Sequence, residues 1–356
     1  MVVSEQGPIL QVEDLHVQFR TAAGQVEALT GVTFDINQNE TVAIVGESGS
    51  GKSVTALTIM GLLNGGRVTS GRILSNGKNI AGMRDKDLRH VRGKEIAMIF
   101  QDPMTSLDPL YSIGNQIVEA IRLHEKVSKQ AAKDRAINLL RQVGIPDPAR
   151  RFDAYPHQLS GGQRQRVMIA IALACSPKLL IADEPTTALD VTVEAQILEL
   201  MRELQAEFQM SILLVTHDMG VVAEMADRVV VFYAGEVVEQ GTAAEVLATP
   251  SHPYTEALFE SIPTPSADRA APLRAIRGAV PSLLHMPQGC RFNPRCTRSF
   301  DKCRTQKVPT FSVGGQQQAR CWLHEEGPKV EVETAVATAT AAAASSGGIE
   351  WQKADR

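Results

Sequence analysis

The eight residues from Gly46 to Ser53 constrain the fold of this 356-residue chain more than any other part of its sequence. They read Gly-Glu-Ser-Gly-Ser-Gly-Lys-Ser, so two glycines with four residues between them are followed by lysine and serine. Thr41–Val45, directly before them, is an apolar and β-branched run that is typical of a buried strand. After them, apolar residues recur at every third position and predict a helix, namely at Val54, Leu57 and Met60.

A strand, a glycine-rich loop and a helix N-terminus in this order form a cradle for phosphate groups. Glycines let the backbone turn tightly, so that successive N–H groups point at phosphate oxygens. Lys52 would bring a cation to the outer phosphates, and the Ser53 hydroxyl would bind Mg²⁺. A glycine-rich surface turn is the alternative, but the flanking strand and helix favour nucleotide binding. The predicted nucleotide-binding residues are Gly46, Glu47, Ser48, Gly49, Ser50, Gly51, Lys52 and Ser53.

Composition narrows the class of protein. Hydrophobic residues make up 44% of the chain, which is enough for a sizeable core, and the formal net charge of −4 gives no general attraction to nucleic acid. Residues 1–20 lack the apolar stretch of a signal peptide, and no apolar run reaches membrane-spanning length. We therefore expect a cytosolic protein, or one that is peripheral to a membrane through its partners.

The order of the predicted elements indicates an α/β fold. Strands are expected at Leu10–Phe19, at Val32–Ile36 after a turn at Thr30-Gly31, and at 41–45, 95–100, 178–182, 212–215, 228–233 and 236–239. Helical patterns lie between several of them, and strands that alternate with helices predict a parallel sheet with helices on both faces. Residues from about 102 to 176 read as an inserted helical subdomain. Within it, one apolar face consists of Ala132, Ala136, Leu139, Leu140 and Val143, with Gly144 as the C-cap.

Polar residues follow the ends of the predicted parallel strands, where α/β sheets collect ligands. Gln101, Asp183-Glu184 and His217 all occupy such positions, as the phosphate loop does. Asp183 would bind Mg²⁺, and Glu184 would activate the attacking water. An Asp-Glu pair alone is more often an ordinary strand-end turn, but the phosphate loop in the same chain favours the catalytic interpretation. Phe19 would either stack on adenine or be a half-buried strand residue, and the sequence favours neither.

Leu159–Gln163, with the sequence Leu-Ser-Gly-Gly-Gln, precedes a strongly helical run. Ser160 is suited to be the N-cap, and the two glycines leave N–H groups open at the positive end of a helix. These five residues match the signature of the ATP-binding cassette at every position. Over residues 9–260 the chain resembles the ATPase subunit of an ABC transporter, with its Walker A, Q-loop, signature, Walker B, D-loop and switch-histidine motifs in order.

This resemblance implies a P-loop NTPase fold that hydrolyses ATP as a head-to-tail dimer. The signature of one subunit would cover the ATP bound to its partner, so that Ser160, Gly161, Gly162, Gln163 and Asp190 act in trans. The implied catalytic residues are Glu184, His217, which would contact the γ-phosphate, and Gln101, and the implied Mg²⁺ ligands are Ser53, Gln101 and Asp183.

Three further stretches resemble the dipeptide and oligopeptide importers within this family. They are Ile99–Pro109, His252–Thr255 and Gly289–Cys296. The resemblance implies the ATPase subunit of a translocase that imports peptides, bound peripherally at the cytoplasmic face of the membrane. Its partners would be two transmembrane permeases, a second ABC ATPase, with a heterodimer favoured over a homodimer, and an extracytoplasmic substrate-binding protein. Importers of nickel, glutathione or sugars remain alternatives, as does, less strongly, a non-transport ABC ATPase.

Four of the five cysteines lie close together in the sequence: Cys290, Cys296, Cys303 and Cys321. In a cytosolic chain such clustering favours a metal centre over disulfides. Structural zinc sites favour pairs two to four residues apart, but the spacings here are five, six and seventeen residues. The resemblance implies a [4Fe–4S] cluster in some members, so this cluster is preferred to Zn²⁺ and to free thiols. Because the cysteines lie outside every ATP motif, we expect a structural or redox-sensing role.

These patterns divide the chain into three parts. Residues 1–260 form the nucleotide-binding domain, residues 261–328 form a small cysteine-rich C-terminal extension, and residues 329–356 form a disordered tail without an assignable function.

Overall fold

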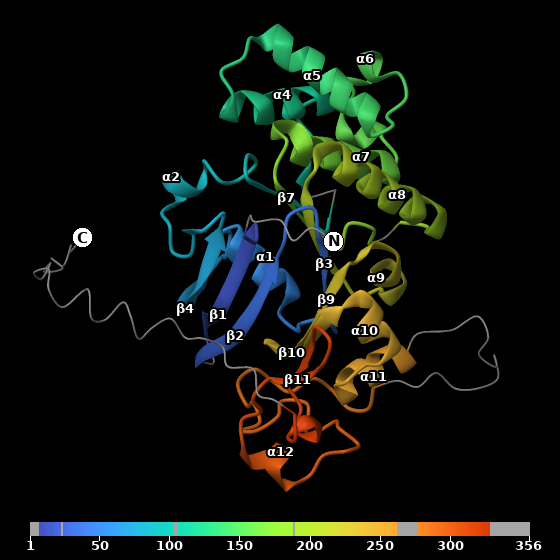
Figure 1. The fold of residues 1–356 in the computed structure, drawn as a ribbon. Coiled ribbons are helices and arrows are strands. Elements are labelled where there is room, and N and C mark those ends of the chain that lie inside the picture. Colours follow the sequence, from blue (N-terminus) through green and yellow to red (C-terminus); the bar gives the residue numbers. More distant parts are fainter. Residues whose placement is uncertain (1–6, 23, 103–105, 188, 262–275, 328–356) are drawn as a thin grey trace, which may run out of the picture.

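The computed structural model describes residues 7–22, 24–102, 106–187, 189–261 and 276–327. Its centre is an eight-stranded sheet in the order β11-β12-β10-β9-β3-β8-β7-β6 (Figure 1). The strands β6, β7, β8, β3 and β9 are parallel, and the remaining three run antiparallel to their neighbours. The bounds are β3 Thr41–Val45, β6 Ile96–Ile99, β7 Leu179–Asp183, β8 Ser211–Thr216, β9 Arg228–Tyr233, β10 Glu236–Thr242, β11 Phe311–Gly314 and β12 Gln317–Ala319. The α/β architecture predicted from the sequence is therefore confirmed.

Alternate residues of the central strands face two different cores. In β8, Ile212 and Leu214 pack against helices α7 (Gly161–Ala172) and α8 (Val191–Phe208). Leu213 and Val215 pack on the other side, against α1 (Lys52–Ile59) and a second sheet. Helices therefore cover one face, whereas on the other face an antiparallel sheet replaces most of the expected helices.

The second sheet has the strand order β2-β1-β4-β5, with bounds β1 Leu10–Thr21, β2 Gly24–Ile36, β4 Gly66–Ser75 and β5 Lys78–Asn79. The predicted turn at Thr30-Gly31 is wrong, because β2 runs through it without a break. Gly31 has a positive φ of 63°, and the pairing of β1 with β2 shifts register between Leu15 and Val17. The glycine therefore makes a bulge inside a long strand and does not end it.

The inserted helical subdomain, predicted over residues 102–176 and so including α7, lies at the top of Figure 1, above α8. It contains α4 Ile113–His124, α5 Lys129–Gln142 and α6 Pro148–Arg151, while short α2 Asp85–Leu88 precedes β6. The predicted apolar face of α5 is confirmed, since Ala132, Ala136, Leu139, Leu140 and Val143 are all buried. Residues 103–105, which belong to the predicted subdomain and Q-loop segment, are outside the described residues.

In α1 the predicted helix is confirmed but its predicted face is only partly buried. Thr55, Ala56 and Ile59 are buried, whereas Val54 and Leu57 are half-buried. The reason is that α1 lies between the two sheets, so that its contacts extend around most of its surface.

The C-terminal segment joins the central sheet, which the sequence patterns did not predict. Strand β12 pairs with β10, and β11 pairs with β12. The helices that precede these two strands in the chain are α9 Met219–Met225, α10 Ala243–Ala248, α11 Pro253–Glu260 and α12 Asp301–Thr305. Glu239 of β10 is buried, and its carboxylate accepts hydrogen bonds from the Ser251 and His252 N–H groups and from Gln317 Nε2. This buried carboxylate links β10, the start of α11 and β12. The predicted tail, residues 329–356, is outside the described residues.

Candidate active site

The phosphate loop connects β3 to α1. Gly46 has a φ of 149°, and a Cβ atom there would lie 2.2 Å from the Phe232 carbonyl oxygen, so that only glycine fits. Gly51, the N-cap of α1, has a φ of 108° and provides no side-chain cap. The first N–H groups of α1 are therefore available to an anion, as the sequence predicts.

Lys52 and Ser53 begin α1. Lys52 Nζ donates hydrogen bonds to the carbonyl oxygens of Gly46, at 2.8 Å, and Glu47, at 3.0 Å. Burial lowers the pKa of Lys52, while the carboxylates of Glu184, Asp183 and Glu47 oppose this effect. The ammonium group thus lies directly over the loop that would hold phosphates.

Asp183, at the end of β7, accepts a hydrogen bond of 3.1 Å from the Ser53 hydroxyl. Burial raises the pKa of this carboxyl, and the Ser53 hydrogen bond opposes the rise. Two oxygen ligands of the kind that Mg²⁺ prefers are therefore adjacent, and they are two of the three ligands that the resemblance implies. The third, Gln101, bonds to Glu184 in this structure, so its role as a Mg²⁺ ligand stays a prediction.

Glu184 forms the centre of a hydrogen-bonded group. Its Oε2 accepts from Gln101 Nε2 and from Thr187 Oγ1, both at 2.9 Å, and its Oε1 lies 3.2 Å from His217 Nδ1. Burial would raise the pKa of Glu184, but the hydrogen bonds from Thr187 and His217 lower it overall. The structure thus brings together all three residues predicted to be catalytic.

Sequence reasoning gave Thr187 no role in the site, because a threonine three residues after a glutamate has no distinctive sequence pattern. Thr187 begins the D-loop, Thr187–Asp190, of which Ala188 is outside the described residues. Asp190 caps α8 by accepting a hydrogen bond of 3.0 Å from Val193 N.

The signature residues begin α7. Ser160 and Gln163 form a reciprocal capping box, in which Gln163 N donates to Ser160 Oγ and Ser160 N donates to Gln163 Oε1. A Cβ atom on Gly162 would lie 2.7 Å from the Val193 side chain, whereas one on Gly161 would make an ordinary contact of 3.8 Å with Leu189. Across the described ranges, no hydrogen bond or ion pair joins Ser160–Gln163 to the phosphate loop of the same chain.

Phe19 lies in β1 and is half-buried, and its ring contacts Gly66 of β4. The half-buried strand position considered from the sequence is therefore confirmed, and stacking on adenine stays a prediction.

The four clustered cysteines line one small cavity of about 10 Å³, together with His252 and Trp322. Burial raises the pKa of Cys290 to about 12 and that of Cys321 to about 11, and it also raises the pKa of Cys296. In the part of the chain that the structure describes, no group of three or more His, Cys, Asp or Glu side chains is arranged to hold a metal ion. The predicted metal centre is thus not shown, although its four residues lie together.

Residues 276–327, which carry the four cysteines and are called the cysteine segment below, contact the phosphate loop. Arg295, which precedes Cys296, makes two bonds to the Glu47 carboxylate, at 2.6 and 3.0 Å. In addition, Glu47 N donates to the Tyr254 hydroxyl at 2.8 Å. Sequence reasoning placed the cysteines outside the ATP motifs and missed this contact, because 248 residues separate the two partners.

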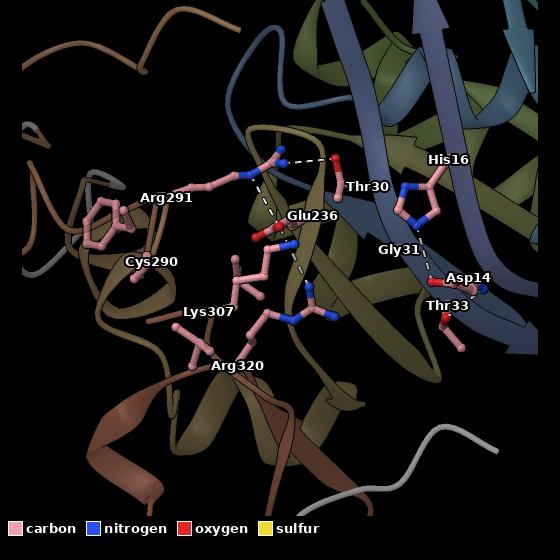
Figure 2. Close-up of a pocket in the computed structure, with 14 residues that line it drawn as sticks. Asp14, His16, Thr30, Gly31, Thr33, Glu236, Cys290, Arg291, Lys307 and Arg320 are labelled. Carbon is pink, nitrogen blue, oxygen red and sulfur yellow. Dashed lines mark hydrogen bonds and ion pairs between the residues drawn. The ribbon is translucent and has the colours of Figure 1, made fainter. Parts of the chain in front are cut away.

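A second group of contacts holds the segment on its other side, around a cavity of about 300 Å³ (Figure 2). Arg291 extends from the cysteine segment, donates to the Thr30 hydroxyl at 2.8 Å and pairs with Glu236 at 3.2 Å. Arg320 approaches the same Glu236 carboxylate at 3.8 Å. The segment is therefore bound to β2 as well as to the phosphate loop.

Comparison of the sequence with known proteins shows which family the chain belongs to. Residues 29–187 match the family described as ABC transporter, and residues 238–303 match that described as oligopeptide/dipeptide transporter, C-terminal region. The chain is 51% identical over 330 residues to the oligopeptide transport ATP-binding protein OppD of Bacillus subtilis, and the match covers 92% of each chain. The chain belongs to the ATP-binding subunits of ABC transporters.

Other similar proteins belong to the same family. The dipeptide transport ATP-binding protein DppD of Escherichia coli (strain K12) is 49% identical over 314 residues, which cover 88% of this ABC ATPase and 96% of DppD. Among solved structures, the dimeric post-hydrolysis state of the cassette MJ0796 with ADP and Pi aligns with a TM-score of 0.60 and 29% identity, over 66% of this chain and 98% of that one.

Membership of this family makes the protein an ATP hydrolase that uses ATP and Mg²⁺. None of the helices within the described ranges is long and apolar enough to span a membrane.

Proposed function

We propose that this ABC ATPase couples ATP hydrolysis to the import of dipeptides and oligopeptides. The observation that carries the proposal is the match of residues 238–303 to the C-terminal region of oligopeptide/dipeptide transporters. The relatives OppD and DppD are named for oligopeptide and dipeptide transport, and their similarity extends over nearly the whole chain.

The site supports hydrolysis through its own residues. The low pKa of Glu184 keeps its carboxylate ionised, so that it can accept a proton from the attacking water. Gln101, Thr187 and His217 hold that carboxylate from three sides. Asp183 and Ser53 would hold Mg²⁺, which neutralises phosphate charge when bound. Lys52 would exchange its bonds to loop carbonyls for bonds to the outer phosphates.

A closed site needs a second cassette. The lack of bonds between Ser160–Gln163 and the phosphate loop across the described ranges supports action of the signature in trans. The dimeric arrangement of MJ0796, at 29% identity, supports the same assembly. The second cassette is proposed to be a different ABC ATPase, which makes the pair a heterodimer.

An apolar groove gives a place for a permease subunit. A cavity of about 230 Å³ lies between the central sheet and the helical subdomain and includes Phe100 and Leu107 among its lining residues. Nearby, Leu110 and Leu123 are about three-quarters exposed. Apolar surface beside Gln101 suits a permease segment that senses ATP at this residue. Two permeases would hold the ATPase at the cytoplasmic face, and an extracytoplasmic binding protein would deliver peptide.

The cysteine segment is proposed to carry a [4Fe–4S] cluster, with Zn²⁺ as the alternative. The residues fit in kind, because four thiols line one cavity and four thiolates are the usual ligands of both centres. The Nε2 atom of His252, which also lines the cavity, is buried and has no hydrogen-bond partner among the described residues. The sulfur atoms would need to move closer together, since they are not arranged for coordination now. Such a centre would hold together a segment with little core of its own.

The transport proposal is tested in proteoliposomes that contain the ATPase, its two proposed permeases, its proposed partner ATPase and the binding protein. Peptide-loaded binding protein is expected to raise the rate of ATP hydrolysis and to drive peptide uptake. Stimulation by nickel, glutathione or sugar, without stimulation by peptide, would assign a different cargo. Hydrolysis that does not respond to any permease would reject transport.

A further inference from the structure

We propose that Arg295 is a positioning residue for ATP binding, because it fixes Glu47 of the phosphate loop and neutralises its charge. This inference rests on the ATP-binding role of the loop given above. It assigns to the C-terminal segment a direct part in nucleotide affinity.

The ion pair is well suited to hold the loop. Both terminal nitrogens of Arg295 bond to the two Glu47 oxygens, and the Arg295 side chain is only 3% exposed. Two parallel charge-assisted bonds fix orientation as well as distance, and shielding from water strengthens them. This pair is therefore of a different kind from the exposed ion pairs elsewhere on the chain, which contribute little.

Arg295 is itself held in place. Its Nε donates to the Arg277 carbonyl oxygen at 2.9 Å, and its guanidinium group lies 5.7 and 5.9 Å from the ring centroids of Tyr233 and Phe292. Phe292 also contacts Tyr254, with ring centroids 5.4 Å apart. The guanidinium group is thus seated in a packed aromatic cluster that joins the cysteine segment to β9 and α11.

On the loop side, Glu47 is fixed at several atoms. Its N–H donates to the Tyr254 hydroxyl, and its carbonyl oxygen accepts from Ser50 N at 3.2 Å and from Lys52 Nζ. The side chain and N–H of Glu47 are therefore bound to the C-terminal part of the chain, while its carbonyl group is bound to the loop and to Lys52. Fixing this residue sets the start of the phosphate cradle before ATP arrives, which reduces the ordering that binding requires.

The negative charge of Glu47 is a second reason why Arg295 would support ATP binding. Glu47 lies inside the loop that would surround a polyanionic triphosphate, where an unpaired carboxylate would repel the ligand. Arg295 balances this charge, and its removal would leave Glu47 partly buried and uncompensated.

The test compares Arg295→Ala with Arg298→Ala in the full-length chain. Arg298 lies in the same segment and pairs with Glu256, away from the phosphate loop. The affinity for a fluorescent ATP analogue is expected to fall about tenfold in Arg295→Ala and to stay within about twofold of wild type in Arg298→Ala. The KM for ATP should rise in parallel, whereas kcat at saturating ATP should change less. An unchanged affinity in Arg295→Ala, or an equal loss in Arg298→Ala, would overturn the proposal.

Two more variants separate positioning from folding. Arg295→Lys keeps the charge but cannot make both bonds, so an intermediate loss of ATP affinity is expected at an unchanged melting temperature. Wild-type affinity in this variant would reject the geometric part of the proposal, even if Arg295→Ala failed to fold. Glu47→Gln combined with Arg295→Ala should recover affinity relative to Arg295→Ala alone, because it removes the unpaired charge.

Lys52→Ala serves as the reference for loss of the nucleotide site. If the wild-type chain bound the analogue no better than Lys52→Ala, the ATP-binding role itself would fail. If wild type bound it well and Arg295→Ala bound it equally well, only the positioning inference would fail.

Discussion

At the scale of single residues, Glu184 shows what the sequence alone does not reveal. It has a positive φ of 47°, in the left-handed region that residues other than glycine rarely adopt. Such a conformation costs about 1–3 kcal/mol, and here it accompanies a carboxylate that bonds to residues from three separate parts of the chain. A carboxylate at this position could be predicted from its place after a strand, but its backbone conformation and its bond to Thr187 could not.

Glu184→Gln should retain ATP binding and lose about 10²–10⁴-fold in kcat, because the amide cannot accept the proton from water. ATP affinity and steady-state hydrolysis of the purified complex measure the two effects. Glu203→Gln, on the exposed side of α8, removes an equal charge and should leave both unchanged. Near-normal hydrolysis by Glu184→Gln would show that another group is the base.

At the scale of elements, prediction succeeded where a regular pattern decides the structure. The helix that became α5 has apolar residues at helical spacing, and the β9–β10 hairpin has Ala234-Gly235 at its turn, both with positive φ. It failed for β11 and β12, which are short and contain glutamine and serine. These two strands exist because β10 offers an edge to pair with, and no local pattern records that.

Ser160→Arg should lower hydrolysis of the assembled dimer at least tenfold and leave ATP binding by the isolated subunit intact. A bulky cation at the start of α7 would occupy the place of the partner's γ-phosphate, and this effect arises only when two cassettes meet. Ser128→Arg is the matched control, since Ser128 caps α5 in the same way, with its side chain accepting from Ala131 N. Loss of nucleotide binding in isolated Ser160→Arg would contradict action in trans.

Cys296→Ser should remove the proposed metal centre. Chain purified without oxygen is expected to hold about four iron and four sulfide ions, which the variant loses together with its colour. Cys175→Ser, in the helical subdomain, should keep them, because Cys175 bonds to the Ala120 carbonyl oxygen outside the cavity. About one zinc ion per colourless chain would favour Zn²⁺, and metal-free wild type would reject both centres.

At the scale of the whole molecule, the C-terminal segment is integrated into the cassette. Ending the chain at Glu260 removes β11, β12 and Arg295, exposes the edge of β10 and leaves Glu239 without its Gln317 bond. We expect the melting temperature to fall by about 5 °C or more and aggregation to increase. A chain that ends at Gly327 keeps every described contact and serves as the control. Equal melting temperatures for the two truncated chains would show that the segment does not support the cassette.

The strand order also has a consequence for folding of the chain during its synthesis. Among the described strands, β3, residues 41–45, has β8 and β9 as its two neighbours, which begin at residues 211 and 228. During synthesis at ~5–20 residues per second, this apolar strand therefore waits about 10–30 s for its first partner to leave the ribosome. The antiparallel sheet of β1, β2, β4 and β5 is synthesised long before then, and in the folded protein its apolar face shares a core with strands β8 and β9, which come later. We therefore expect the first 200 residues to expose apolar surface on the ribosome until the parallel sheet can close.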